Sequence, residues 1–243
     1  DRAALRLSDE QKAQYLAQNR KPHYRFKLQN KEIVWHDLIR GRVSYQALHL
    51  SDPIIVREDA TFTYMLCSAI DDFDYKISHI FRGEDHINNT AIQLQMFEAI
   101  GANMPEIGHL SFLKAKDEKI SKREGGFEVK KLASEGIEPM TVNSFFAYTG
   151  TSKPVVAKHN MQDLVEDFDI SCFSASPSIY NPQDILLLNH KLLVDSTYKE
   201  VKESLDKLGL AKIDESFWLA IRPNLQYLKD AQVWWDICHG QIE

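Results

Sequence analysis

Residues 77–113, ISHIFRGEDHINNTAIQLQMFEAIGANMPEIGHLSFL, decide the fold class. They begin with a short β-rich run at residues 77–82, and apolar side chains then recur at helical spacing from position 92 to position 100. Gly101 predicts the end of that helix, and a second β-rich run follows at residues 107–113. Strand and helix thus alternate here, which is typical of part of a parallel α/β sheet.

The sequence before this stretch predicts a helix and a hairpin. Ser8 and Gln11 have the spacing of a capping box and predict the first helix. Residues 23–28 alternate in polarity, and residues 33–35 form a second β-rich run. We therefore expect these two runs to pair as a hairpin, after which residues 37–42 lead through a loop to the next segment.

The helix patterns next to the deciding stretch also have predicted ends. Residues 64–70 predict an apolar helix that is closed by Asp71 and Asp72. The polar residues 88–90 predict the cap of the following helix, because Asn and Thr side chains accept hydrogen bonds from free backbone N–H groups.

The C-terminal half is predicted to be helical, with no convincing strand after residue 126. Thr197 and Glu200 form a second capping box, and Pro223 is expected to start the last helix. The other predicted helices are at residues 128–135, 139–149, 160–167 and 182–193.

The composition indicates an ordinary folded protein. Hydrophobic residues make up 44% of the 243 residues and charged residues 26%, enough for real cores and close to the average for water-soluble proteins. The formal net charge is −6. This counts mildly against a purely electrostatic nucleic-acid binder, which should be basic, and leaves a local basic surface open.

Cysteine usage and hydropathy favour a reduced, cytoplasmic setting. The three cysteines form no CxxC pair, so neither a disulfide framework nor a four-ligand zinc site is expected. We also expect neither a membrane span nor a signal peptide, because no apolar run is long enough and the first segment is polar and helical. The sequence opens on Asp1 rather than Met, and we expect its natural start to have been removed.

The first candidate site is the run Arg82-Gly83-Glu84-Asp85-His86, which lies between a predicted strand and a predicted helix. Ligands of parallel sheets bind outside the carboxyl ends of the strands. An arginine at that place can form a bidentate pair with a carboxylate or a phosphate. The alternative is a surface turn in which Arg82 pairs with a neighbouring glutamate, and position alone leaves both readings open.

Two further groups of residues could bind a charged ligand. Lys119, Ser121, Lys122 and Arg123 precede a glycine pair and could hold a polyphosphate, although such a loop is more often only solvated. Tyr64 and Ser68 lie four residues apart, on one face of a predicted helix. They could line a small polar pocket, or they could simply pack and satisfy hydrogen bonds. The histidines lack the spacing of a helical zinc site.

Taken together and in order, several blocks resemble the glutamyl-tRNA synthetase family of class I enzymes. The blocks are SDPIIVREDATFTYMLCSAIDDFDYKISHIFRGEDHINNTAIQLQMFEAIGA, HLSFL, KISKREGG and EGIEPMTVNSFFAYTGTS. The run KISKR resembles the family's version of the class I Lys-Met-Ser-Lys-Ser signature. The resemblance covers residues 1–193 well and 194–243 loosely.

The resemblance implies an α/β fold, the C-terminal half of a Rossmann-like class I catalytic domain with parts on either side. Residues 1–50 would belong to a connective insertion at the tRNA acceptor end, and residues 51–115 to the second half of the catalytic domain. Residues 116–195 would carry the signature loop and an all-α stem-contact region, and residues 196–243 the start of a helical anticodon-binding bundle. The family's other signature, similar to His-Ile-Gly-His, does not occur in this sequence, so we expect a partial chain that is inactive alone.

Family roles transfer only to matching positions. Tyr64, Ser68 and Arg82 match residues of the glutamate pocket, where Arg82 would pair with the substrate carboxylate and relatives often have Asn in place of Ser68. His86 matches a position where some relatives place an aromatic residue against ATP. Lys119 and Lys122 of the signature loop would be the catalytic cations. The ATP-binding positions of that loop would be Lys119, Ser121, Lys122 and Arg123.

The implied reaction joins glutamate to tRNA(Glu) through a glutamyl-adenylate, with ATP and its Mg²⁺ as substrate and without zinc. tRNA(Gln) is a second candidate partner. Two alternatives from the same ancestry stay open at this point. One is a paralogue that transfers glutamate to a modified tRNA base, which the helical tail after residue 194 argues against. The other is a non-catalytic RNA-binding protein derived from a synthetase, which the retained Arg82 and the retained loop at residues 119–123 argue against.

Overall fold

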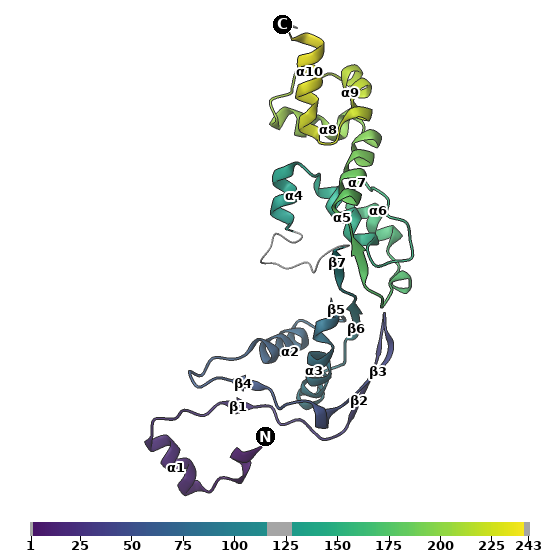
Figure 1. Ribbon diagram of the computed structural model, residues 1–243. Helices are drawn as coiled ribbons and strands as arrows, with labels where there is room; N and C mark the ends of the chain where they lie inside the picture. Colours follow the sequence, from purple (N-terminus) through teal and green to yellow (C-terminus); the bar gives the residue numbers. More distant parts are fainter. Residues whose placement is uncertain (1, 116–127, 241–243) are drawn as a thin grey trace. The chain divides into compact units, whose positions relative to one another are not determined.

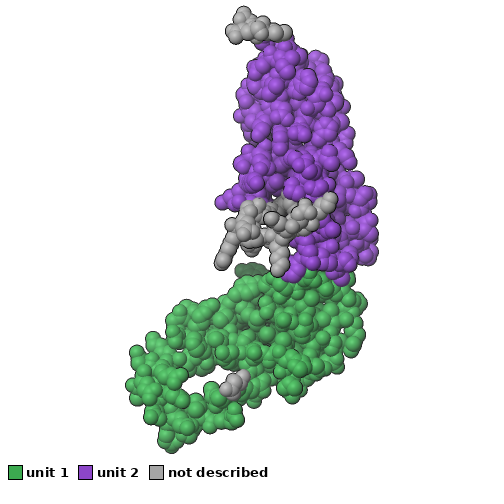
Figure 2. Space-filling model, viewed as in Figure 1, with its two compact units in different colours: residues 1–110 green, residues 111–243 purple. Residues whose placement is uncertain are grey.

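A computed structural model describes residues 2–115 and 128–240 (Figure 1). The chain divides into two compact units, Asp1–Leu110 and Ser111–Glu243 (Figure 2). Among the described residues, no helix is both long and apolar enough to cross a membrane. The finer division at residues 50, 115 and 195 stays a prediction.

The first unit contains a four-stranded sheet with the order β3-β2-β6-β5. Strands β5 (His79–Gly83) and β6 (Glu106–Leu110) run parallel, and helix α3 (Ile87–Ile100) connects them along the chain. The register pairs Arg82 with His109. The predicted alternation of strand, helix and parallel strand is therefore confirmed.

The predicted hairpin was wrong in its partners. Strand β2 (Glu32–Asp37) pairs with β3 (Gly41–Gln46), so only residues 38–40 connect the two strands, in a tight turn, and the loop expected over residues 37–42 was wrong. Gly41, the first residue after that turn, has φ +70, a conformation that glycine adopts at no steric cost. Strand β1 (Tyr24–Arg25) instead pairs with β4 (Ile54–Val56).

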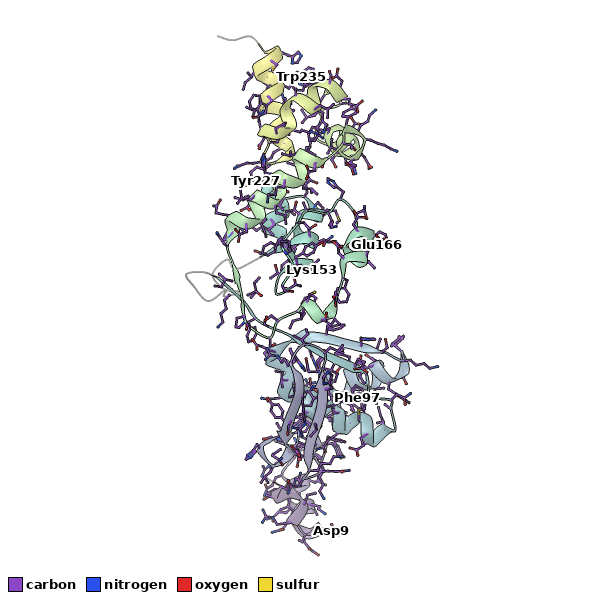
Figure 3. The ribbon with its side chains drawn as sticks, turned by 90° about the vertical axis from the view of Figure 1, so that its right-hand side faces the viewer. Asp9, Phe97, Lys153, Glu166, Tyr227 and Trp235 are labelled. Atoms are coloured by element: carbon purple, nitrogen blue, oxygen red, sulfur yellow. The ribbon has the colours of Figure 1, made fainter. Side chains whose placement is uncertain are left out.

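Helix α3 forms the main apolar face of the first unit. Its residues from Thr90 to position 97 are buried, and Phe97 lies in a core that also includes Ile33 of β2 and Ile107 of β6 (Figure 3). Gly101 ends the helix in the left-handed conformation, as predicted. The cap predicted at residues 88–90 was wrong, because the helix begins at Ile87 and those residues lie within its first turn.

The remaining elements of the first unit are short or lie at its edges. The Ser8 capping box opens α1 as predicted, with Gln11 bonded back to the cap. Helix α2 continues past the predicted stop at Asp71 and Asp72. The bounds are η1 (Ala3–Arg6), α1 (Asp9–Ala17), η2 (Ala47–His49), α2 (Tyr64–Asp74) and η3 (Glu84–His86).

The second unit is mainly helical, as predicted, but it contains one short pair of strands. Strand β7 (Leu113–Ala115) runs parallel to β8 (Ser178–Tyr180), so the expectation of no strand after residue 126 was wrong. The predicted strand at residues 107–113 is likewise divided between β6 and β7. Strands this short form because they pair with a distant segment, and a local sequence pattern does not indicate that partner.

The predicted helices of the second unit are confirmed as α4 to α7, and the Thr197 capping box opens α8. The last helix, α10, begins at Ala231, whereas Pro223 lies in the short turn η5. Helix α9 was not predicted. The helices are α4 (Val129–Glu135), α5 (Pro139–Tyr148), α6 (Met161–Asp167), α7 (Pro182–Asp195), α8 (Tyr198–Lys207), α9 (Glu215–Ile221) and α10 (Ala231–His239), and the short turns are η4 (Ile170–Cys172), η5 (Arg222–Asn224) and η6 (Leu228–Asp230).

Candidate functional site

Arg82 lies near the carboxyl end of strand β5, one residue before the strand ends and the chain turns into η3. Its parallel neighbour β6 ends at the same edge, because Gly83 is paired with Leu110. In sheets of this kind the edge formed by the carboxyl ends of the strands is where ligands bind. The sequence-based placement of Arg82 at such an edge is therefore confirmed.

Both terminal nitrogens of Arg82 are held by side chains of α3. Nη1 donates to Oε1 of Gln93 at 2.6 Å, and Nη2 donates to Oγ1 of Thr90 at 2.6 Å. The buried Nε has no hydrogen-bond partner among the described residues. Burial lowers the pKa of Arg82, against the opposing effects of Tyr64 and Asp72, but an arginine stays protonated in proteins.

The alternative reading of Arg82 as one half of a surface Arg–Glu pair does not describe this structure. Glu84 forms its ion pair with Arg40, and both side chains are about one-fifth exposed. The guanidinium group of Arg82 is instead bound by neutral side chains, and no carboxylate in the described part of the chain contacts it. A partly buried cation of this kind favours an anionic ligand.

Ser68 is joined to Arg82 through a single side chain. Gln93 Nε2 donates to Ser68 Oγ at 2.8 Å, while its Oε1 accepts from Arg82. Tyr64 lies one turn earlier on α2 and is 74% exposed, although its hydroxyl is close enough to Arg82 to interact electrostatically. The structure thus brings Ser68 and Arg82 together and places Tyr64 at the open side.

His86 marks the start of α3 and lies only partly exposed. Its backbone carbonyl oxygen lies 3.1 Å from the Thr90 hydroxyl oxygen, and its Nδ1 lies 3.1 Å from the Asn89 side-chain nitrogen. The ring is also 3.7 Å from Asp85. The structure therefore places His86 beside Thr90, whose hydroxyl contacts Arg82.

A buried acid–histidine pair lies behind Thr90, and sequence reasoning did not find it. Asp37 and His109 are both completely buried, with His109 Nδ1 2.5 Å from Asp37 Oδ2. His109 Nε2 lies 2.8 Å from Thr90 Oγ1. Two features of the sequence could have pointed to it. His109 lies on the predicted strand that would pair with the strand of Arg82, and Thr90 and Gln93 lie three residues apart on the helix between these strands.

The electrostatics of this pair follow from burial and from hydrogen bonds. Burial lowers the pKa of His109, although Asp37 acts in the opposite direction. Burial alone would raise the pKa of Asp37, but hydrogen bonds from the His109 side chain and from the backbone N–H groups of Arg40, His109 and Ile39 together hold it below its usual value. The pair is therefore a carboxylate beside a neutral imidazole.

Other predicted site residues lie outside the described part of the chain. Lys119, Ser121, Lys122 and Arg123 are all in the segment 116–127, so their roles stay predictions. Within residues 2–115 and 128–240, no group of three or more His, Cys, Asp or Glu side chains could hold a metal ion. The expected absence of zinc stays a prediction.

The fold and the site define an α/β protein with a partly buried arginine at the carboxyl edge of parallel strands. Residues 1–186 match the family model described as tRNA synthetases class I (E and Q), catalytic domain. The chain belongs to this family, and the resemblance noted in the sequence is confirmed.

Curated relatives agree with this assignment. Glutamate–tRNA ligase 1 of Rickettsia bellii (strain OSU 85-389) is 54% identical over 240 residues, which are 98% of this chain and 54% of the relative. Glutamate–tRNA ligase 2 of Rickettsia canadensis (strain McKiel) is 53% identical with the same coverage. The chain thus spans about half the length of the curated relatives it matches.

The solved structures support the fold. A glutamate tRNA ligase from Elizabethkingia meningosepticum superposes with a TM-score of 0.76 at 24% identity, covering 93% of this chain and 51% of that one. The enzyme from Elizabethkingia anophelis gives 0.75 at 23% identity, with 93% and 52% coverage. The predicted mixed α/β fold class is confirmed.

Proposed function

We propose that this chain is part of an ATP-dependent ligase that attaches glutamate to tRNA(Glu). The glutamate carboxylate attacks the α-phosphate of ATP, which forms glutamyl-adenylate and releases pyrophosphate. The terminal ribose hydroxyl of the tRNA then takes the glutamyl group and releases AMP. Catalysis of this kind depends on positioning and on charge stabilisation, because the protein forms no covalent bond with its substrate.

The glutamate pocket is proposed to lie at the carboxyl end of β5. Arg82 pairs with the substrate carboxylate, and its fork of N–H donors matches the geometry of that group. Tyr64 and Ser68 complete this side of the pocket from α2, where both residues lie on one face. The observation that carries the proposal is Arg82 itself, a partly buried cation at a ligand-binding edge that no carboxylate contacts among residues 2–115 and 128–240.

His86 and the residues of the signature loop are proposed to bind ATP with its Mg²⁺. Lys119, Ser121, Lys122 and Arg123 bind the phosphates, and Lys122 stabilises the charge that develops as pyrophosphate leaves. The partners in the second step are tRNA(Glu) and, as a second candidate, tRNA(Gln). We propose that the reaction takes place in the cytoplasm, and that residues 1–243 alone do not activate glutamate.

Charging assays with the complete gene product test this proposal. Purified tRNA(Glu) and tRNA(Gln) are each incubated with glutamate, ATP and Mg²⁺. We expect glutamylation of tRNA(Glu), and a loss of about 100-fold or more in the rate for Lys122→Ala, which removes one charge from the transition state. Lys130→Ala, on the exposed face of α4, is the matched control and should retain the wild-type rate.

The outcome separates the alternatives left open by the sequence. Additional charging of tRNA(Gln) would make the enzyme non-discriminating. The absence of charging with either tRNA would contradict the proposal and favour a non-catalytic role or transfer to a tRNA base. Pyrophosphate exchange catalysed by residues 1–243 alone would overturn the claim that this segment is inactive by itself.

A further inference from the structure

We propose that Asp37, His109 and Thr90 form a positioning chain, which fixes the orientation of the Arg82 guanidinium group for the substrate carboxylate. The inference rests on the proposed function, because Arg82 is the glutamate-binding residue there. It assigns a role to three side chains that would not themselves contact glutamate.

The positioning chain crosses four elements of the first unit. Asp37 ends β2, His109 lies on β6, Thr90 lies in the first turn of α3, and Arg82 lies on β5. The successive contacts are 2.5 Å from Asp37 to His109, 2.8 Å from His109 to Thr90, and 2.6 Å from Thr90 to Arg82. The first three residues are completely buried, whereas Arg82 is only partly buried. The chain therefore leads from the interior to a ligand-accessible cation.

The donors and acceptors along the chain have one consistent direction. Asp37 is a carboxylate and only accepts, so Nδ1 of His109 carries the proton that faces it. Because burial lowers the pKa of His109, its ring is neutral and Nε2 is an acceptor. The Thr90 hydroxyl lies closer to this nitrogen, at 2.8 Å, than to the His86 carbonyl oxygen, at 3.1 Å. Its proton therefore goes to His109, and an oxygen lone pair is directed at Arg82.

The other terminal nitrogen of Arg82 is fixed in a comparable way. Gln93 Oε1 accepts from Nη1, and the orientation of the Gln93 amide is set by its donation to Ser68 Oγ at 2.8 Å. Because both terminal nitrogens are bonded, any rotation of the guanidinium plane would break one or both of these hydrogen bonds. One N–H of each terminal nitrogen is left without an acceptor among the described residues. Pre-oriented donors of this kind lower the entropy cost of binding a carboxylate.

A purely structural role for this polar network and a role in positioning Arg82 lead to different expected effects when the network is lost. With a purely structural role, its loss would lower the free energy of unfolding and leave glutamate affinity unchanged in the molecules that stay folded. A positioning role predicts instead a selective rise in KM for glutamate. Thr90 is the residue at which a structural role and a positioning role can best be distinguished, because its contact with Arg82 is made through the hydroxyl group.

The test compares Thr90→Val with Thr90→Ser in the complete gene product. Valine keeps the shape and removes the hydroxyl, whereas serine keeps the hydroxyl. We expect Thr90→Val to raise the KM for glutamate about tenfold, because a hydrogen bond to a charged group is lost. The KM for ATP should stay within about twofold, and Thr90→Ser should restore the KM for glutamate to about twofold of wild type.

Thr141→Val is the matched control. Thr141 is also completely buried, and its hydroxyl donates to Asn189 at 2.9 Å in the second unit. This variant loses a comparable hydrogen bond and should leave the KM for glutamate unchanged. An equal rise in both valine variants would overturn the positioning role, as would an unchanged KM in Thr90→Val.

His109→Asn gives a second, independent measurement that also decides the matter if Thr90→Val does not fold. Asparagine can still donate to Asp37 but has no acceptor at the place of Nε2. We expect the same rise of about tenfold in the KM for glutamate, and no further rise when both substitutions are combined, because the residues act through one contact. Additive effects would contradict the chain. Lack of glutamylation by the wild-type protein would instead contradict the proposed function.

Discussion

The two units bury polar side chains in different ways. In the first, Asp37, His109 and Thr90 lead to the partly exposed Arg82. In the second, Asn189 is completely buried and is bonded chiefly to backbone groups: its Oδ1 accepts from the Glu138 N–H at 2.9 Å, and its Nδ2 donates to the Gln226 carbonyl at 2.6 Å.

This difference indicates what each network does. Asn189 lies on α7 and connects the start of α5 with the segment that follows η5, so its hydrogen bonds fix how these parts pack. No charged side chain contacts Asn189 among the residues that the structure describes. The network of the first unit includes a carboxylate and a guanidinium group, and it ends where a ligand can reach. A buried polar network that ends on the backbone is structural, whereas one that ends on an accessible cation can orient a binding group.

The largest stability effect is expected at Asn189. Asn189→Leu keeps the approximate volume but leaves the Glu138 N–H, the Gln226 carbonyl and the Thr141 hydroxyl without their partner. We expect a loss of about 3 kcal/mol in the free energy of unfolding, measured by urea denaturation. The exposed Asn143 on α5 provides the matched control, and Asn143→Leu should change stability by less than about 0.5 kcal/mol.

An effect of Asn189→Leu on glutamate binding would contradict the distinction between a structural network in the second unit and a positioning network in the first. Folded Asn189→Leu protein should keep the wild-type KM for glutamate, because the hydrogen bonds of Asn189 with described residues all lie within the second unit. A selective rise in that KM would mean that the two networks do not differ in role as described.

A smaller effect is expected from pH, through the buried His109 of the first unit. The pKa of His109 is lowered in the folded state, so between that value and the unfolded value of about 6.5 the unfolded chain binds more protons. The stability contributed by the neutral ring is therefore present above about pH 6.5 and is lost as pH falls below it. The slope is at most about 1.4 kcal/mol per pH unit.

Urea denaturation between pH 7.5 and pH 5 measures this dependence. His109→Asn should reduce the slope, whereas substitution of the exposed His49 by Asn should leave it unchanged. An identical slope in wild type and His109→Asn would show that the buried ring does not hold a lowered pKa. The Asp37 carboxylate acts separately, because its lowered pKa affects stability only below about pH 3.8.

The sequence predicted the parts of the molecule that depend on local pattern. The apolar spacing of α3, its stop at Gly101 and the capping boxes at Ser8 and Thr197 were all found where expected. The partner of β2 was not predicted, because strand pairing is a choice between distant segments. In this structure β2 pairs with β3 across a tight turn that is followed by Gly41 in the left-handed conformation.

The candidate site was predicted only in part, for a related reason. Arg82 could be placed at a strand end from its neighbours in the chain, and Tyr64 and Ser68 from helical spacing. Thr90 was interpreted as a cap residue, whereas its side chain contacts Arg82 and His109. Asp37 and His109 lie 72 residues apart in the chain, and only the pairing of β2 with β6 brings them together.

The central claim is that Arg82 binds glutamate, and calorimetric titration of glutamate into the complete protein tests it most directly. Arg82→Lys keeps the charge but removes the fork of donors held by Thr90 and Gln93. We predict that the Kd for glutamate rises at least about tenfold, while the midpoint of urea denaturation changes little. An unchanged Kd in a folded Arg82→Lys protein would contradict the account.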